Sequence, residues 1–197
     1  IMPSFTFVAS FEAVLSVGAI PVLADVDESL TLAPDEVRAA ITPRTKSIVP
    51  VHLYGQAADM NAIMELAQQH NLFVIEDNAQ AIGAHYTFAD STQVQTGTIG
   101  HIGCTSFFPS KNLGCYGDGG AIFTNDDDLA AKMRMIANHG QSKRYYHDVD
   151  GCNKRLDSIQ AAILRIKLRD LDNYIAARRK VADHYDQFFA QFEEITT

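Results

Sequence analysis

The sequence has few of the residues that build disulfide-rich or metal-stabilised domains. Its three cysteines, Cys104, Cys115 and Cys152, are odd in number and form no C-x-x-C pair. This pattern argues against a disulfide framework and a structural zinc site, and it favours a reducing, cytoplasmic setting. The seven histidines are scattered, and no two stand at the helical spacing of a metal-ligand pair. We therefore expect no metal site.

The sequence also lacks long apolar runs and an excess of positive charge. No apolar run approaches the roughly 18 residues that a membrane-spanning helix needs. Lysine and arginine number 16 against 24 aspartates and glutamates, a formal net charge of -8. This balance argues against non-specific binding to nucleic acid or to an anionic membrane, but it leaves room for one local basic pocket. No G-x-G-x-x-G follows the first predicted strand, so dinucleotide binding has no support.

The 197 residues, 47% of them hydrophobic, suffice for one sizeable α/β domain. Apolar residues at helical spacing alternate with short apolar runs. They predict helices over residues 11–17, 34–41, 59–67, 125–138 and 157–192, and strands over residues 3–8, 21–24, 47–51, 72–75, 103–108 and 121–124. Such alternation predicts a largely parallel sheet covered by helices on both faces.

Two other segments have a distinct character. Residues 139–153 are polar and are predicted to form one long loop. In the last predicted helix, large apolar side chains recur at steps of three and four residues, and they are Tyr174, Val181, Tyr185, Phe188 and Phe192. We interpret this aromatic face as a packing surface rather than a cofactor site.

A lysine in a glycine-rich turn is the first candidate for chemistry. Lys111 lies between two predicted strands, five residues after the hydroxyl of Ser106. Apolar neighbours, Phe107, Phe108 and Leu113, favour the neutral amine, which is a nucleophile toward carbonyl carbon. Taken alone, a solvated loop lysine is the alternative reading.

A carboxylate at the end of another strand is the second candidate. Asp77 follows the predicted strand 72–75 directly, and Gln80 comes one helical turn later. Asp77 could instead cap the turn that follows it. Together with Lys111, however, Asp77 and Ser106 supply what a pyridoxal phosphate site requires: an amine, a partner for the pyridine nitrogen and a phosphate ligand.

Several ordered motifs carry a resemblance to a known family. They are FTF at 5–7, VHLYG at 51–55, EDNAQ at 76–80, the lysine turn, and CNKRLDSIQAA at 152–162. With them the chain resembles the sugar aminotransferases of the DegT/DnrJ/EryC1/StrS family. That resemblance implies the aspartate aminotransferase type of fold, which is pyridoxal phosphate fold type I, and pyridoxal 5'-phosphate as cofactor.

The resemblance also implies roles for the cofactor-binding residues. Lys111 would be the Schiff-base lysine, and it would move the proton between substrate and cofactor as general base and then general acid. Asp77 would pair with the pyridine nitrogen. Gln80 would contact the phenolic oxygen of the ring, Ser106 would bind the phosphate, and Phe7 would stack on the ring.

The remaining implications concern the substrate, the partner subunit and the extent of the chain. Asn153 would reach across a homodimer interface to the phosphate in the partner's active site, and Arg155 would help to hold an anionic substrate. Residues 1–155 would form part of the large domain, and residues 156–197 a long helical segment leading toward a small carboxy-terminal domain. We expect this piece of a longer protein to bind pyridoxal phosphate poorly and to be inactive by itself.

The motifs FFPSK at 107–111, GCYGDGG at 114–120 and HGQ at 139–141 look most like one subgroup of that family. Its members act on UDP-linked 3-keto sugars of the UDP-2-acetamido-2-deoxy-3-oxo-glucuronate type, with glutamate as amino donor, for bacterial surface polysaccharide. The alternatives are a pyridoxal phosphate-dependent sugar dehydratase, which carries histidine in place of the lysine, and a non-catalytic binding or regulatory domain of the same fold. Lys111 favours transamination.

Overall fold

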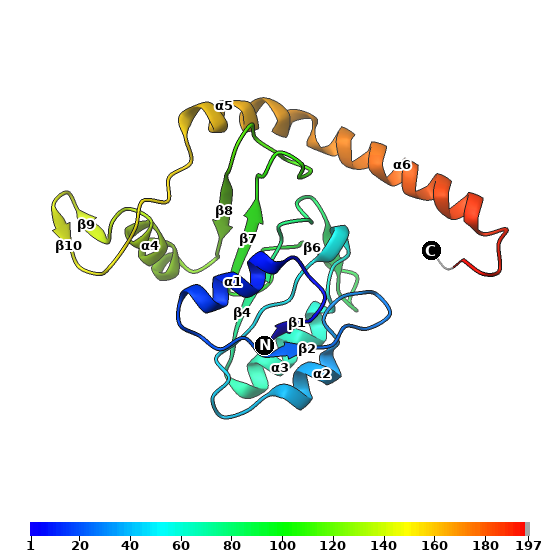
Figure 1. The fold of residues 1–197 in the computed structure, drawn as a ribbon, viewed down its shortest axis with the longest axis horizontal. Helices are drawn as coiled ribbons and strands as arrows, with labels where there is room; N and C mark the ends of the chain where they lie inside the picture. The colour runs from blue at the N-terminus through cyan, green and yellow to red at the C-terminus, as the bar shows by residue number, and fades with distance from the viewer. Residues whose placement is uncertain (196–197) are drawn as a thin grey trace.

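A four-stranded sheet forms the middle of the molecule (Figure 1). The computed structural model describes residues 1–195. The strands lie in the order β3 (Ser47–Ile48), β4 (Phe73–Asp77), β7 (Ile102–Ser106) and β8 (Gly120–Phe123). The first three run parallel, and β8 is antiparallel to β7. The sheet is therefore mostly parallel, as the alternation of elements predicts.

A short parallel pair, β1 (Met2–Pro3) and β2 (Leu23–Ala24), continues the sheet beyond β3. The Val49 amide donates to the Ile1 carbonyl at 2.8 Å and joins the pair to the sheet. The predicted strand over residues 3–8 is wrong, because β1 ends at Pro3 and Val8 already opens a helix. The side chains of Phe5 and Phe7 in this run are exposed, so no core packing holds it in a strand.

Residues 1–195 also contain six α-helices and two short 3₁₀ turns. The helices are α1 (Val8–Ser16), α2 (Pro34–Ala40), α3 (Met60–His70), α4 (Asp127–Ile136), α5 (Ser158–Lys167) and α6 (Leu171–Phe189), and the turns are η1 (Leu53–Gly55) and η2 (Leu168–Asp170). Two antiparallel ribbons complete the chain, β5 (His85–Thr87) with β6 (Gln93–Gln95) and β9 (Gln141–Lys143) with β10 (Tyr146–His147). No helix within residues 1–195 combines the length and the apolar character that crossing a bilayer requires.

Aspartate side chains cap two of the helices, α3 and α4. Asp59 caps α3 by accepting a hydrogen bond from the Ala62 amide, and Asp126 caps α4 by accepting from the amides of Asp128 and Leu129. These contacts satisfy amides that have no partner within the helix, and they place negative charge where the helix dipole favours it.

Two apolar clusters hold the elements in place. The larger one lies between α2, α3 and the β3–β4 part of the sheet, and its fully buried members include Val37, Ile48, Ile63 and Val74. The smaller one contains Phe107, Leu113, Cys115, Leu164 and Leu171, and it packs α5 and the start of α6 against the lysine turn. The second cluster therefore determines where Lys111 lies.

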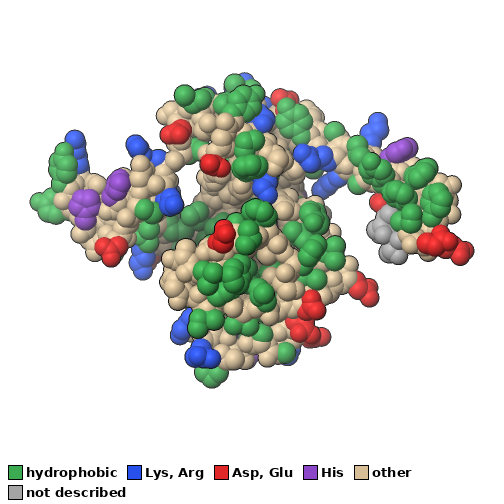
Figure 2. All heavy atoms as spheres, in the orientation of Figure 1, with side chains coloured by type: hydrophobic (Ala, Val, Ile, Leu, Met, Phe, Trp, Pro, Cys, Tyr) green, Lys and Arg blue, Asp and Glu red, His purple; other side chains and the backbone are tan. Residues whose placement is uncertain are grey.

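Two parts of the chain stand away from this body (Figures 1 and 2). One comprises α4 and the β9–β10 ribbon. The prediction of one long loop over residues 139–153 is wrong, because the polar strands β9 and β10 pair with each other, although they bury little apolar surface. The other is the distal part of α6. The aromatic face predicted to pack remains about half exposed at each of its five members (41–55%), so within residues 1–195 it is not covered.

Candidate active site

Asp77 is the last residue of β4 and faces a cavity under α1. It pairs in register with Cys104 of β7, and Ser106, two residues further along β7, lies on the same face of the sheet. All three line a cavity of about 410 Å³, which α1 closes with side chains that include Ser10. The predicted strand 72–75 is too short, because β4 carries Asp77 itself. The structure thus brings Asp77 and Ser106 together.

Two hydrogen bonds orient the Asp77 carboxylate. The Ser10 hydroxyl donates to Oδ2 at 2.6 Å, and the Ala79 amide donates to Oδ1 at 3.0 Å. The second bond is the turn-capping contact that the sequence left open as an alternative. A carboxylate held on both oxygens and facing a cavity can cap the turn and still offer charge to a ligand. The neighbouring Cys104 stays a neutral thiol, because burial and then the Asp77 charge raise its pKa.

A buried hydrogen bond between His52 and Glu76 supports the other face of this strand end. Glu76 is fully buried and accepts hydrogen bonds from His52 Nε2 (2.9 Å) and from the amides of Gly97 (2.7 Å), Ile99 (2.7 Å) and Gly100 (2.5 Å). His52 Nδ1 accepts from the Ala58 amide at 3.1 Å, so the ring proton lies on Nε2. Burial alone would raise the pKa of Glu76, but the bonds from His52, Gly100 and Gly97 outweigh it and lower the pKa.

The Lys111 turn is held by contacts with the elements around it. The Lys111 amide donates to the Phe108 carbonyl at 2.9 Å. On the far side of the turn, Lys167 of α5 donates to the Gly114 carbonyl, and Gln160 of α5 accepts from the Tyr116 amide at 2.8 Å. A Cβ on Gly114 would overlap the Pro109 carbonyl, so the close approach of the chain to itself requires glycine there.

Lys111 lines a second cavity, of about 580 Å³, together with Gln80. The Gln80 side-chain carbonyl accepts from the Tyr54 amide at 2.8 Å, which fixes the amide at the cavity wall. Ala79 lines the Asp77 cavity and Gln80 lines the Lys111 cavity, so consecutive residues border the two cavities. The structure therefore places Lys111 and Asp77 in neighbouring cavities rather than in one.

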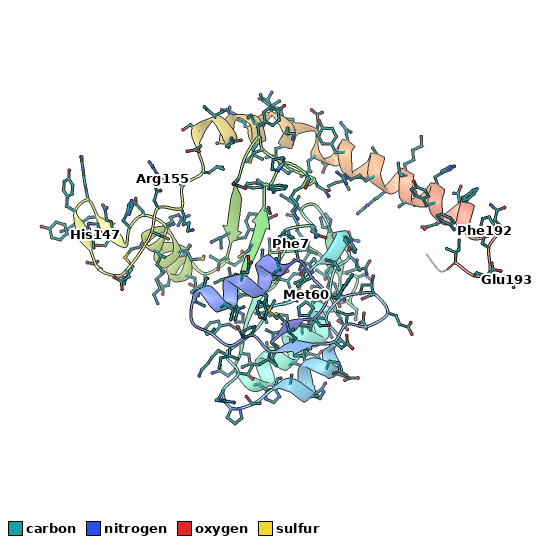
Figure 3. The ribbon with its side chains drawn as sticks, viewed as in Figure 1. Phe7, Met60, His147, Arg155, Phe192 and Glu193 are labelled. Atoms are coloured by element: carbon teal, nitrogen blue, oxygen red, sulfur yellow. The ribbon has the colours of Figure 1, made fainter. Side chains whose placement is uncertain are left out.

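The other three candidate residues lie outside both cavities. Phe7 is exposed at the N-cap of α1. Arg155 Nε donates to Asn153 Oδ1 at 2.8 Å, and both residues are exposed on the segment that precedes α5. Figure 3 shows Arg155 well separated from Phe7. Arg155 instead borders a cavity of about 980 Å³ between β8 and α4.

Comparison with known proteins shows the family of the chain. The sequence profile of the DegT/DnrJ/EryC1/StrS aminotransferase family matches residues 1–197. The chain belongs to this family. Over 187 residues it is 54% identical to UDP-2-acetamido-2-deoxy-3-oxo-D-glucuronate aminotransferase of Pseudomonas aeruginosa, covering 94% of this chain and 51% of that protein. Over 188 residues it is also 54% identical to UDP-N-acetyl-3-dehydro-alpha-D-glucosamine 3-aminotransferase of Acidithiobacillus ferrooxidans, covering 94% and 49%.

Solved structures of the family have the same fold. The crystal structure of DesV from S. venezuelae in complex with a ketimine intermediate superimposes with a TM-score of 0.89 at 45% identity, covering 96% of this chain and 50% of that one. The chain spans about half the length of the relatives it matches. The family and the fold class predicted from the sequence are confirmed. The roles of the seven candidate residues and the domain boundary at residues 155 and 156 stay predictions.

The structure adds residues that the sequence did not single out for the site. Ser10 binds Asp77 across 67 positions of sequence, and Arg178 and Arg179 of α6 line the Lys111 cavity. No local pattern marks these contacts. His52 and Glu76 stand in motifs already noticed, and both are fully buried. Each directly follows an apolar run in the sequence, and a polar residue in that position was the signal that could have found them.

Proposed function

We propose that the full-length protein that carries this chain is a pyridoxal phosphate-dependent aminotransferase. It transfers the amino group of an amino-acid donor to a keto carbon of a nucleotide-linked sugar. The observation that carries the proposal is a pair of cavities bordered by consecutive residues in a chain of this family: Asp77 and Ser106 line one, and Lys111 and Gln80 line the other. An amine, an oriented carboxylate and a hydroxyl are the donor set that the cofactor requires, so the residues present fit it.

Each residue then has a physical task. Asp77, already oriented by Ser10 and Ala79, would hold a protonated ring nitrogen. Ser106 would donate to the phosphate, and Gln80 would contact the ring oxygen. When bound, the cofactor supplies an electron-accepting ring. The Lys111 amine, freed from the cofactor, would carry a proton between the substrate carbon and the cofactor carbon, first as general base and then as general acid.

The relatives suggest the substrate. Two relatives that are 54% identical are named for 3-oxo or 3-dehydro sugars linked to UDP. We therefore propose a UDP-linked 3-keto sugar as acceptor, glutamate as donor, and a biosynthetic role in surface polysaccharide such as lipopolysaccharide O-antigen, carried out in the cytoplasm. The amino group of glutamate replaces the sugar's keto oxygen and leaves 2-oxoglutarate. Faster turnover of a 4-keto sugar would contradict this substrate.

We also propose a homodimer with shared active sites. Asn153 and Arg155 are exposed and lie outside the cavities that contain Lys111 and Asp77. Side chains placed in this way can serve the cofactor site of a second copy more readily than that of their own chain.

Borohydride trapping tests the proposal. The full-length protein is incubated with pyridoxal phosphate, reduced with borohydride and digested, and the Lys111 peptide should gain the mass of the reduced cofactor. The Lys111→Ala variant should gain none, while incubation of the wild type with glutamate and a UDP-3-keto sugar should release 2-oxoglutarate. A wild-type protein that traps no cofactor would refute the aminotransferase assignment and favour a non-catalytic domain.

A further inference from the structure

One face of α6 points into the cavity that contains Lys111. Its members are Ile175, Arg178, Arg179 and Ala182, at the i, i+3, i+4 and i+7 spacing of a single helical face. The aromatic members of α6 lie mainly on the adjoining face, and Arg178, four residues after Tyr174 and three before Val181, stands at the border between the two faces. The two arginines therefore form part of the cavity wall, although they lie more than 60 residues from Lys111 in sequence.

Close packing fixes this face of the helix. Ile175 packs against the cluster around Phe107, and a Cβ on Gly83 would overlap its Cδ1 atom. Gly83 lies in the loop that follows Gln80 and has a φ of 84°. The backbone of that loop therefore touches α6 directly. Arg178 and Arg179 follow within one turn, so the same contact places them over the Gln80–Lys111 cavity.

The charges around this cavity all have one sign. Its wall contains Lys111, Arg178 and Arg179, and among the described residues no aspartate or glutamate lines it. Within residues 1–195, no carboxylate oxygen lies within 4.0 Å of these three cationic groups. The whole chain carries a net charge of -8, so three unpaired cations around one cavity run against its overall balance. Such a local concentration of positive charge attracts an anion.

We propose that Arg178 and Arg179 form an anion subsite at the mouth of the Lys111 cavity. The inference rests on the proposed function, because it assigns the anion to a substrate of that reaction. Two substrate groups have the required chemistry: a carboxylate of the amino donor and the diphosphate of the nucleotide sugar. Each guanidinium can bind either group through two parallel hydrogen bonds, which lysine cannot do. Ser110 and Asn112 in the same wall offer neutral hydrogen-bond donors.

The test measures the binding of two non-reacting probes to the full-length protein loaded with pyridoxal phosphate. UDP represents the diphosphate and glutarate represents the donor's carboxylates. Titration calorimetry compares the wild type with Arg178→Gln, Arg179→Gln and the double variant, which keep most of the side-chain length but lose the charge. Lys180→Gln is the matched control, because Lys180 neighbours Arg179 on the same helix, is exposed and does not line the cavity.

We expect the double variant to bind one probe roughly 10- to 100-fold more weakly, as the loss of charge-assisted hydrogen bonds predicts. Weaker UDP binding assigns the subsite to the nucleotide sugar, and weaker glutarate binding assigns it to the amino donor. Arg→Lys variants should show intermediate affinity. If the double variant binds both probes as the Lys180→Gln control does, the anion subsite is refuted.

The outcome is distinguishable from a failure of the proposed function. Probe binding needs no turnover, so an arginine-dependent affinity without transamination would keep the subsite and overturn the aminotransferase assignment. Transamination with probe affinities independent of both arginines would do the reverse. Unfolding midpoints of all variants, measured by circular dichroism, should agree with the wild type within about 2 °C, because both side chains are exposed.

Discussion

The Glu76 carboxylate is fully buried, yet four donors surround it. Removing a buried charge of this kind is destabilising, because the donors that face it would lose their acceptor and could not form hydrogen bonds to water instead. Its neighbour in sequence, Asp77, points to the opposite face of the sheet. Glu76 therefore supports the strand end from below while Asp77 faces the cavity.

Replacement of Glu76 should change how the unfolding free energy depends on pH. The pKa of Glu76 is lowered in the folded protein, so its contribution to stability is fully present above the unfolded pKa of about 4.3 and is lost as pH falls through the lower folded pKa. Glu76→Gln turns an amide donor toward backbone amides, and we expect it to cost about 3 kcal/mol at pH 7. Urea unfolding between pH 7 and pH 3 should show that the difference in unfolding free energy between wild type and variant becomes smaller as pH falls. A constant difference would contradict the assignment.

Ser10 should affect cofactor binding, because it orients the Asp77 carboxylate. Loss of its 2.6 Å hydrogen bond in Ser10→Ala frees one carboxylate oxygen, and a bond to a charged group contributes about 1.5–3 kcal/mol. We expect the dissociation constant for pyridoxal phosphate, measured by absorbance titration of the full-length protein, to rise roughly tenfold. Ser16→Ala on the same helix is the control, because Ser16 only contacts the Ala13 carbonyl. Equal affinities for the two variants would show that Ser10 does not orient Asp77.

At this scale the sequence predicts the residues that end strands but not the residues that orient them. Asp77 and Ser106 could be placed together because adjacent parallel strands end at the same edge of a sheet. Ser10 could not, because its contact depends on how α1 lies across the sheet. The same holds for Arg178 and Arg179, whose helix reaches the cavity only through tertiary packing.

Among the elements, α6 makes one especially close contact with the loop after Gln80. Gly83→Ala places a methyl group against Ile175 and forces a positive φ on alanine, so we expect a loss of about 2 kcal/mol in unfolding free energy. Adding Ile175→Ala removes the obstructing side chain, and the double variant should be less destabilised than the sum of the two single variants. A double-mutant cycle from urea unfolding measures this coupling. Strictly additive changes in unfolding free energy would show that Gly83 and Ile175 are not energetically coupled.

Helices were the elements best predicted from the sequence, because capping residues and apolar spacing are local signals. Asp59 and Asp126 mark the starts of α3 and α4 by the amides they satisfy. The β9–β10 ribbon gave no such signal, since its polar strands have no buried face to produce an alternating pattern. The antiparallel direction of β8 was also invisible, because direction depends on the path of the connecting loop.

On the scale of the whole molecule, the exposed pair Asn153 and Arg155 makes a test in trans possible. We expect full-length Lys111→Ala and Asn153→Ala homodimers to be nearly inactive. If Asn153 serves the partner's site, a mixed dimer keeps one intact site, and an exchanged mixture should regain roughly a quarter of wild-type activity. Activity assays before and after subunit exchange measure this recovery.

The control for subunit exchange is a mixture of Lys111→Ala with itself, which should remain inactive. No recovery after verified exchange would place Asn153 in the site of its own chain. The sequence alone suggested sharing only through family resemblance. The structure supports the proposed sharing only by placing Asn153 and Arg155 outside the cavities of their own chain that contain Lys111 and Asp77.

The pairing of β7 with β8 has one more consequence. Ser106 and Gly120 are register partners, so residues 107–119 form a closed loop whose two ends are hydrogen-bonded to each other. The loop that contains Lys111 is therefore a unit whose two ends are held at fixed positions by the β7–β8 pairing. Exchanging it between relatives should leave the strand register intact, which makes it the natural unit for grafting new reactivity onto this scaffold.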